Sequence, residues 1–390
     1  MASRAEIYVN AAIAAADGND ALQDQWMQLK KFYEEKLWHQ VTKAILEGFA
    51  NDRLGVLSLK EMFDNFISEF KSHMNLEDLA IIVIYVADDM FKTDQEAAIE
   101  FLKSQEESFA RNKPAAIRIQ VGVIDLYLKI RDDKGALIHK AAVKELIESA
   151  EKAVDELSGV TMTHAPFFRV YALYHRETKN YAAYYQEALR YLGCEDLDIL
   201  EESTKIEYAV LLCFAALLGR DVYNFGELLA HPVLQFIAEG QYKWLYELVM
   251  AFNAGDIPKF KALETVWGEW PDLKENEAFI MDKIRILSFM DLASTRANHE
   301  RKIPLAEIAK KAEIPTDQAE FLVMRAFSKK LVQGSIDQVN QVVEVTWVAP
   351  RVLSRAQIGG LANRFMDWMR KTTSVEDVMK DEAGELIVKS

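Results

Sequence analysis

Cysteine is nearly absent from this sequence of 390 residues, which contains only Cys194 and Cys213. Each lies in a helical pattern with no second cysteine nearby, so the chain has neither a disulfide framework nor the four ligands of a zinc ribbon. Free cysteine is among the most frequently buried residue types. We therefore expect both thiols to be buried, in a protein of a reducing compartment.

Proline is also scarce, with eight residues in the chain and none before Pro114. The stretches between the prolines, such as 59–70 and 141–157, repeat apolar residues at steps of three and four, which is the period of one helix face. No strand-like alternation occurs before residue 334. The pattern predicts a mainly α fold, with about a dozen helices between residues 20 and 295 forming an irregular solenoid. Tyr181–Leu189 has the small and large alternation of tetratricopeptide (TPR) helices.

Long hydrophobic runs are missing as well. The longest apolar stretches are Leu79–Ala87 and Tyr208–Gly219, whereas a helix that spans a bilayer needs about 20 apolar residues. Residues 1–16 lack the apolar segment of a signal peptide. We expect both apolar stretches to be buried helices, no membrane partner, and a location in the cytoplasm and nucleus.

Motifs that carry catalysis or bind cofactors are absent from the sequence. It has no phosphate-binding glycine loop, no nucleophile elbow and no paired-histidine metal motif. The seven histidines are scattered singly, and adjacent acids such as Asp88 and Asp89 point about 100° apart on a helix. We expect no enzyme activity, no cofactor and no metal, and we expect His231 to lie in a structural turn.

The sequence pattern changes near residue 300. Residues 278–296 predict a long amphipathic helix, 303–309 a second helix with Pro304 in its first turn, and 316–331 a third with Thr316 as its N-cap. After residue 334 the apolar period becomes two, which indicates a strand over 343–347 that pairs with 335–338 as a hairpin. Three helices followed by a hairpin predict a winged-helix module.

Winged helices often bind DNA, so a nucleic-acid adaptor is one alternative. The whole chain has a formal net charge of -15, and residues 278–350 contain ten basic and nine acidic side chains. The third helix of the module opens with Asp317 and Glu320, where a helix that reads a DNA groove needs cations. These charges disfavour nucleic acid as a partner and favour contact with protein.

A terminal helix is predicted from Leu353 onward, with an apolar stripe on one face. Such a stripe either folds back on its own domain or packs against another protein. The hairpin offers a second surface, because an unpaired strand edge can pair with a neighbouring protein. For the apolar side chains of its second strand, the alternative to contact with a partner is packing on the helices of the same module. The predicted protein-interaction residues are Ser335, Ile336, Asp337, Val343, Val345, Trp347, Ile358, Leu361, Phe365 and Trp368.

A helical solenoid followed by a neutral winged helix and a terminal helix resembles the architecture of the PCI-domain family. The residues that carry the resemblance are spread over nearly the whole chain: Lys36–Gln40, Ala215–Gly219, Tyr223–Leu234, Ala251–Asp256, Gly334–Asp337 and Thr346–Leu353. PCI proteins serve the proteasome lid, the signalosome and translation initiation factor 3, and the similarity here is to a member from the proteasome lid.

The resemblance implies a non-catalytic structural subunit of the 26S proteasome regulatory-particle lid, which supports lid assembly and ubiquitin-dependent protein degradation. It implies a hetero-oligomer with other PCI subunits, formed through winged-helix and C-terminal-helix contacts, that also positions the deubiquitinase and ubiquitin-receptor subunits. We expect helical repeats over 1–165, a PCI helical part over 166–274, a winged helix over 275–352 and an assembly helix over 353–390. The alternatives are a PCI subunit of the signalosome or of translation initiation factor 3, and the nucleic-acid adaptor.

Overall fold

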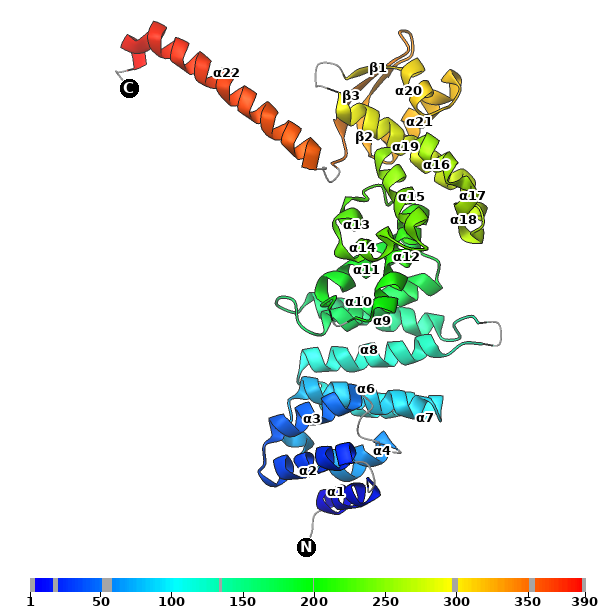
Figure 1. The fold of residues 1–390 in the computed structure, drawn as a ribbon, viewed down its shortest axis with the longest axis vertical. Coiled ribbons are helices and arrows are strands. Elements are labelled where there is room, and N and C mark those ends of the chain that lie inside the picture. The colour runs from blue at the N-terminus through cyan, green and yellow to red at the C-terminus, as the bar shows by residue number, and fades with distance from the viewer. Residues whose placement is uncertain are drawn as a thin grey trace. The chain divides into compact units, whose positions relative to one another are not determined.

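The fold is taken from a computed structural model, which describes residues 4–16, 20–50, 58–132, 135–198, 200–296, 301–350 and 355–387 (Figure 1). The chain divides by its internal contacts into two compact units, residues 1–199 and residues 200–390. The predicted mainly α fold is confirmed. The predicted four-part division is finer than these two units and stays a prediction, and its last boundary, between 352 and 353, lies outside the described residues.

The first unit is built from helices that follow one another with short turns. Helix α8 packs against α6, α7, α9 and α10, and α10 packs in turn against α11 (Figure 1). Among the described residues of this unit, the one β-feature is an isolated bridge between Arg131 and Leu137. The helices are α1 (Arg4–Ala15), α2 (Asp20–Glu34), α3 (Trp38–Ala50), α4 (Leu59–Met62), η1 (Phe63–Ile67), α5 (Ser68–Phe70), η2 (Lys71–His73), α6 (Leu76–Phe91), α7 (Gln95–Phe109), α8 (Lys113–Lys129), α9 (Lys140–Asp155), α10 (His164–Glu177) and α11 (Tyr181–Cys194).

Local sequence explains where several of these helices begin. The side chains of Asn75, Asp94, Asn112 and Asn180 each accept a hydrogen bond from a backbone N–H in the first turn of the helix that follows. Such caps satisfy N–H groups that have no partner inside the helix. The apolar run predicted as buried helix at Leu79–Ala87 lies in α6, where it supplies core residues such as Ile82 and Val83.

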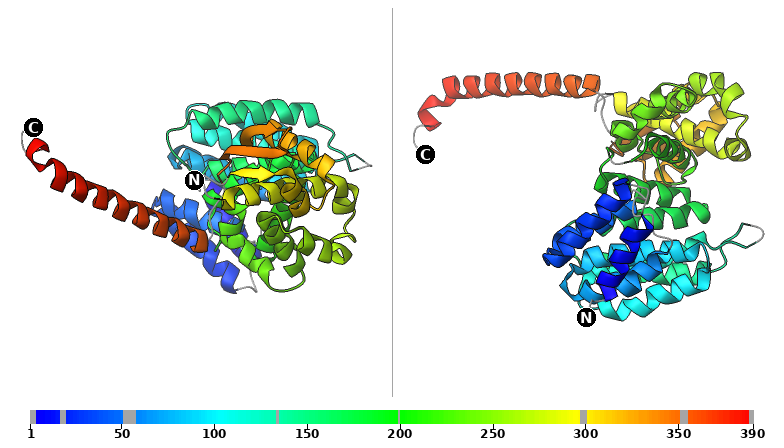
Figure 2. Two further views of the ribbon diagram at one scale, coloured as in Figure 1. Left: turned by 90° about the horizontal axis from the view of Figure 1, so that it is seen from above. Right: turned by 60° about the horizontal axis from the view of Figure 1, so that its bottom comes forward.

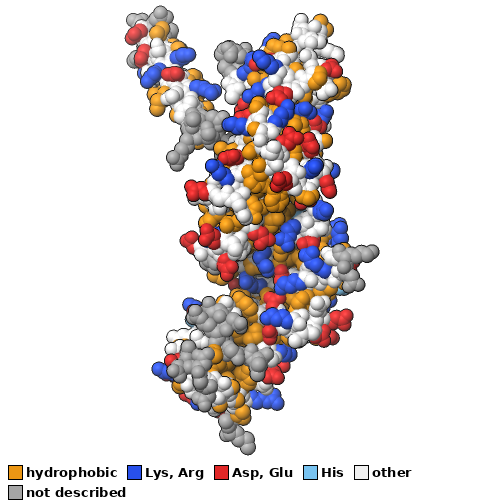
Figure 3. Space-filling view, turned by 45° about the vertical axis from the view of Figure 1, so that its right-hand side comes forward, with side chains coloured by type: hydrophobic (Ala, Val, Ile, Leu, Met, Phe, Trp, Pro, Cys, Tyr) orange, Lys and Arg blue, Asp and Glu red, His pale blue; other side chains and the backbone are white. Residues whose placement is uncertain are grey.

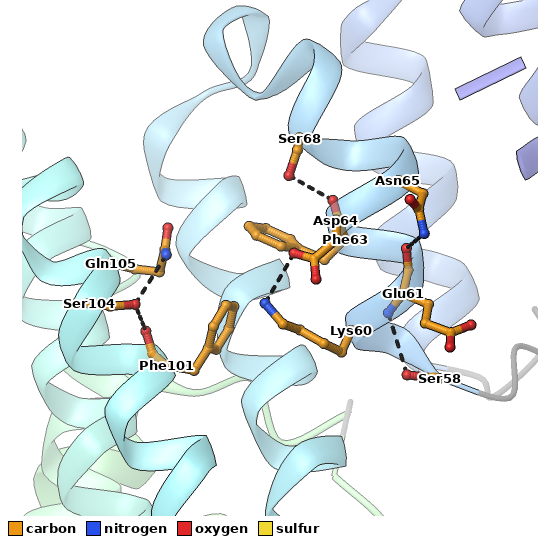
Figure 4. A network of polar contacts seen from close by, with 10 residues as sticks. All are labelled: Ser58, Lys60, Glu61, Phe63, Asp64, Asn65, Ser68, Phe101, Ser104 and Gln105. Atoms are coloured by element: carbon orange, nitrogen blue, oxygen red, sulfur yellow. Dashed lines mark hydrogen bonds and ion pairs between the residues drawn. The ribbon is translucent and has the colours of Figure 1, made fainter. Parts of the chain in front are cut away.

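The predicted helix over 59–70 is interrupted by one wider turn. Residues 59–62 are α-helical, η1 is a π-helix, and α5 continues the helix to Phe70. The Ser68 hydroxyl donates to the Phe63 carbonyl at 2.9 Å, across the widened turn. Beside it Lys60 pairs with Asp64 and lies 4.2 Å from the ring centre of Phe101, so the turn is tied to α7 (Figure 4). The wider turn depends on i→i+5 hydrogen bonding, which the apolar spacing of the sequence did not predict.

The second unit begins with shorter helices around the buried helix α12. These are α12 (Glu202–Leu218), α13 (Gly226–Ala230), η3 (Pro232–Leu234), α14 (Gln235–Ala238), α15 (Lys243–Ala254), α16 (Ile257–Ala262), α17 (Glu264–Trp267), α18 (Pro271–Glu275) and the long α19 (Glu277–Thr295). His231 lies in a turn as predicted, and its Nδ1 atom accepts from the backbone N–H of Val233 at 3.2 Å. Cys213 is buried in α12, but Cys194 is exposed at the end of α11, so the expectation that both thiols are buried is wrong for Cys194.

The predicted winged helix follows in the same unit. Helices α20 (Leu305–Lys311) and α21 (Thr316–Ser328) lead into strands β2 (Val332–Asp337) and β3 (Val342–Val348). A third strand, β1 (Lys302–Pro304), pairs with β3, and the sheet order is β1-β3-β2. The prediction that Ile303 and Pro304 belong to a helix is therefore wrong. Thr316 is the first helical residue and makes no side-chain cap, so its predicted role as the N-cap is also wrong.

Candidate protein-interaction surfaces

No group of three or more histidine, cysteine, aspartate and glutamate side chains suited to a metal ion occurs in the part of the chain that the structure describes. No helix among those residues is both long and apolar enough to cross a membrane. The remaining candidates for a functional site are the predicted protein-interaction residues on the wing and on the terminal helix.

Two of the three predicted wing residues on β3, Val343 and Val345, face inward rather than toward a partner. Val343 is fully buried, and Val345 is nearly so. Strand β3 is central in the sheet, with Ile303 of β1 and Ile336 of β2 on either side of Val343. Both valine side chains therefore pack inside the wing, which is the alternative that the sequence left open for them.

Trp347 lies near the end of β3 and is 41% exposed. Its register partner is Gln333, next to a bulge between Gln333 and Gly334. At this bulge a Cβ atom added to Gly334 would lie 2.2 Å from the carbonyl oxygen of Glu344, which is closer than atoms can pack. The glycine therefore permits the close approach of the two strands, and the bulged sheet leaves the indole open to solvent.

The outer edge of the wing is β2, and among the described residues no strand pairs with its far side. Ser335 and Asp337 are exposed there, and Ile336 is half-buried. An edge strand carries backbone N–H and C=O groups that can add a strand from another chain. The predicted residues Ser335, Ile336 and Asp337 thus lie together on an edge with free pairing capacity.

The tip of the wing is held by a local hydrogen-bond network. The two carboxylate oxygens of Asp337 accept from the side-chain amide and the backbone N–H of Asn340, at 2.7 and 3.0 Å. The side-chain bond from Asn340 is the main cause that lowers the pKa of Asp337. Val339, at the turn, is 93% exposed. The network fixes the turn and leaves an apolar side chain at its end.

The predicted terminal helix is α22 (Arg355–Ile387), a single helix of 33 residues (Figure 2). None of its side chains between 358 and 381 is buried. The predicted stripe is exposed along its whole length, with Phe365 at 57% and Trp368 at 67%. Exposed apolar side chains on one helix face are typical of a surface that another helix or domain covers.

The stripe is longer than the sequence analysis predicted. It continues beyond Trp368 through Val375 and Met379, which are also exposed. The steps from Ile358 through Leu361, Phe365 and Trp368 alternate between three and four residues, and Thr372 fills the gap before Val375. This 3-4 alternation is typical of helices that pack side by side in a bundle. The continuation was not predicted, because the polar Thr372 interrupts the apolar pattern at the position after Trp368 in the stripe.

A further apolar pair that the sequence analysis did not single out lies on α21. Phe321 is 61% exposed and Met324 is half exposed, one helical turn apart on the outer face. In a DNA-binding winged helix this face would meet the groove, but here its first turn carries Asp317. The sequence could have indicated this pair, because Phe321 and Met324 are three residues apart and lie off the face that buries Ala319, Leu322 and Val323.

Several cations of the winged helix are paired with acids of the same unit. Arg325 pairs with Asp282, and Arg296 pairs with Glu307. On the face in Figure 3, acidic and basic side chains are interspersed. Phosphate binding needs several cations that are free to point the same way. The absence of nucleic acid among the partners stays a prediction.

One lysine of the module is buried rather than exposed. Lys283 of α19 donates from Nζ to the carbonyl oxygens of Ala216, Leu217 and Gly219 at 2.6, 3.1 and 2.7 Å. These carbonyls lie at the C-terminal end of α12, where helix geometry leaves them without partners. Burial lowers the pKa of Lys283 to about 7. The side chain therefore joins the helical part of the unit to α19 and is not available to a ligand.

Comparison with known proteins identifies two matching families. Residues 25–249 match the family described as PSD13 N-terminal repeats, and residues 260–347 match the PCI domain. The chain is 31% identical over 376 residues to a 26S proteasome non-ATPase regulatory subunit 13 homolog B from Arabidopsis thaliana, covering 94% of this chain and 95% of the relative. The subunit 13 of Dictyostelium discoideum is also 31% identical, over 94% of this chain and 95% of its own.

A more distant similarity covers only part of the chain. Subunit M of eukaryotic translation initiation factor 3 from Chaetomium globosum is 29% identical over 185 residues, which are 46% of this chain and 42% of the relative. The similarity to subunit 13 outweighs this partial one, because the repeat-family match covers more than half of the chain and the subunit 13 relatives cover 94% of it. This protein belongs to the family of the 26S proteasome non-ATPase regulatory subunit 13, and it contains that family's N-terminal repeats and a PCI domain.

Proposed function

We propose that the protein is a non-catalytic structural subunit of the 26S proteasome regulatory-particle lid. The observation that carries this proposal is the exposed apolar stripe of α22, together with the names of the full-length relatives. A protein whose terminal helix leaves residues such as Phe365 and Trp368 in solvent is suited to be one part of a larger assembly. Aromatic residues of this kind carry much of the binding free energy at protein interfaces.

The two surfaces have different tasks in this proposal. The stripe of α22 packs with helices of other subunits in a bundle, and the 3-4 spacing of its apolar residues supports this role. The edge of β2, with Ser335, Ile336 and Asp337, pairs with a neighbouring PCI subunit through backbone hydrogen bonds. The exposed Trp347 adds an aromatic contact beside that edge, whereas Val343 and Val345 stabilise the wing from inside.

The assembly defines the remaining parts of the proposed function. The protein forms a hetero-oligomer with the other PCI subunits and positions the deubiquitinase and ubiquitin-receptor subunits of the particle, in the cytoplasm and nucleus. It supports ubiquitin-dependent proteolysis without catalysing a step of it. The relatives are named as regulatory and non-ATPase subunits, which supports a role without catalysis.

The test is recovery of the complex with variants of α22. A tagged full-length chain carrying Phe365→Ser and Trp368→Ser should recover proteasome subunits at least about tenfold less than the wild type, because two aromatic contacts are lost. The matched control carries Asn363→Ala and Ser374→Ala, which lie on the opposite face of the helix. Quantitative mass spectrometry of the recovered proteins measures the effect, and deletion of all residues after Leu353 should give the same loss.

Two outcomes would contradict the proposal. Equal recovery by the stripe variant and the control would remove α22 from assembly. Recovery of signalosome or initiation-factor subunits by the wild-type chain, in place of proteasome subunits, would assign the protein to another PCI complex. Circular dichroism of each purified variant confirms that its helices are formed.

A further inference from the structure

A cavity of about 250 Å³ opens on the first unit, remote in sequence from the wing and from α22. Its walls come from α8 and from the two helices that pack against it, α6 and α10. The volume is below the range of about 300 to 1,000 Å³ that is usual for cofactors and drug-sized ligands. A site of this size suits one or two side chains of another protein.

The cavity wall carries two acids and two arginines, and Lys129 beside it adds a third cation. The two acids on its wall are Asp88 and Asp125, and both are engaged by cations. Lys129 lies 2.6 Å from Asp88 and 2.9 Å from Asp125, and Arg169 lies 3.3 Å from Asp125. Burial opposes the charge of Lys129, but the two carboxylates outweigh it and raise the pKa of Lys129. Arg118 is the remaining cation on the wall. Glu195 and Glu77 act on it through space, but no described carboxylate forms an ion pair with it.

The guanidinium group of Arg118 is held by one hydrogen bond, but another of its donors has no partner. Its Nη1 atom donates to the carbonyl oxygen of Met162 at 3.0 Å. Its Nε atom is buried and has no hydrogen-bond partner in the described part of the chain. Burial lowers the pKa of Arg118 by more than the charges of Tyr85, Glu195 and Glu77 raise it, so these neighbours do not fully replace the water that the cation has lost. A carboxylate that entered the cavity would supply the missing charge and acceptor.

The surroundings of Arg118 are apolar. Ile81, Ile84 and Val121 line the cavity beside it. The loop that contributes the Met162 carbonyl also exposes two apolar side chains, Val160 at 77% and Met162 at 81%. A ligand that fits both features has a carboxylate next to aliphatic groups. An acidic side chain within an aliphatic peptide segment has this chemistry, and a free inorganic anion does not.

We propose that the cavity between α6, α8 and α10 binds a segment of a partner protein that carries an aspartate or glutamate flanked by aliphatic residues. The carboxylate pairs with Arg118, and the aliphatic neighbours lie against Ile81, Ile84 and the loop at Val160 and Met162. The docking site is independent of the wing edge and of α22, so it adds a third contact region to the protein.

Binding to the purified full-length chain tests the proposal directly. The probe is acetyl-Leu-Glu-Leu amide, compared with acetyl-Leu-Gln-Leu amide by saturation-transfer NMR. We expect the glutamate peptide to bind and the glutamine peptide to bind at least about tenfold more weakly, as the loss of a charge-assisted hydrogen bond implies. Arg118→Gln should remove the preference. Arg111→Gln, at an exposed arginine outside the cavity, should keep it.

Several results would overturn the proposal. They are equal binding of the two peptides to the wild-type chain, equal loss of preference in Arg118→Gln and Arg111→Gln, or displacement of the glutamate peptide by equimolar inorganic phosphate. The peptide comparison uses the unaltered chain, so it remains decisive if Arg118→Gln folds poorly.

A second experiment finds the partner segment in the assembled complex. A photo-reactive phenylalanine at Ile81 in the tagged chain should crosslink to an acidic, aliphatic segment, and Arg118→Gln should lower the yield at least about fivefold. A crosslink to a segment without an acidic residue, or no crosslink in a sample that contains the complex, would contradict the docking site. If no proteasome subunits are recovered, the proposed function fails, and the peptide experiment still decides the cavity.

Discussion

Lys283 shows how a single side chain can connect two structural parts. Its ammonium group reaches three carbonyl oxygens that lie 64 to 67 residues earlier in the chain. The rings of Tyr223, Phe225 and Phe279 surround it at 5.4 to 5.8 Å. The pKa of Tyr223 is raised to about 12, chiefly by burial. The site is closed and apolar, so loss of the lysine would leave the end of α12 without donors.

Replacement of this lysine should destabilise the second unit. We expect Lys283→Met to lower the free energy of unfolding by about 2 kcal/mol, because buried acceptors without donors cost about 1 to 3 kcal/mol. Urea denaturation followed by circular dichroism measures the change. Lys274→Met is the control, since Lys274 is exposed and lies on the same unit. Equal stability of the two variants would show that the three hydrogen bonds contribute little.

The same residue gives a pH dependence whose sign follows from its pKa. The folded-state pKa of about 7 lies below the ordinary lysine pKa of 10.5. Between these values the unfolded chain binds a proton that the folded chain does not, so the free energy of unfolding rises with pH. The stability of the wild type relative to Lys283→Met should therefore be greater at pH 9 than at pH 6. Thermal unfolding at both values tests this, and a difference that shrinks as pH rises would mean that the carbonyl groups retain the ammonium form.

Among the elements, the wing depends on one glycine. The bulge at Gly334 lets β2 approach β3 so closely that no Cβ atom fits, as the 2.2 Å distance to Glu344 shows. The bulge also sets the register of Ser335, Ile336 and Asp337, which form the edge proposed to pair with a neighbour. A change at this position acts on the whole strand, because the register determines which residues face the core.

Substitution of this glycine should therefore disrupt the wing. We expect Gly334→Ala to destabilise the β2–β3 pairing by about 1 to 3 kcal/mol, the usual cost of forcing an atom into filled space. Faster hydrogen exchange of backbone amides over 342–348 would report it. Gly359→Ala in α22 is the control, since nothing lies within 4 Å of its added Cβ atom, and alanine there favours the helix. Unchanged exchange in the first variant would contradict the role of the bulge.

The elements also differ in how far their sequence predicts them. Helices such as α9 followed from apolar spacing, because their buried residues recur at steps of three and four along one face. Strand β1 was missed, because it has three residues with only Ile303 buried, and its partners Val342, Val343 and Glu344 lie about 40 residues away. Its pairing with β3 is a long-range interaction, and the apolar spacing of the neighbouring residues does not predict it.

At the scale of the whole molecule, the mainly α fold and the winged helix were predictable, and so was the stripe of α22. The cavity beside Arg118 was not, because its walls come from three helices and its charge balance depends on which acids Lys129 and Arg169 reach. Counting charges along the chain gave a net value for the winged helix, but the count could not show that one of its cations, Lys283, is buried. Which charged side chains pair and which are buried depends on the folded structure, so the sequence alone could not show it.

The exposed face of α22 also limits how much of the protein a cell can hold without its neighbours. An unaccompanied copy presents Phe365, Trp368 and Met379 to water, and such surfaces associate with one another or with chaperones. If α22 packs with other subunits as proposed, overproduction of this one chain should lower its solubility, and co-production with those subunits should restore it. Under the same proposal, synthesis in matched amounts keeps this face covered.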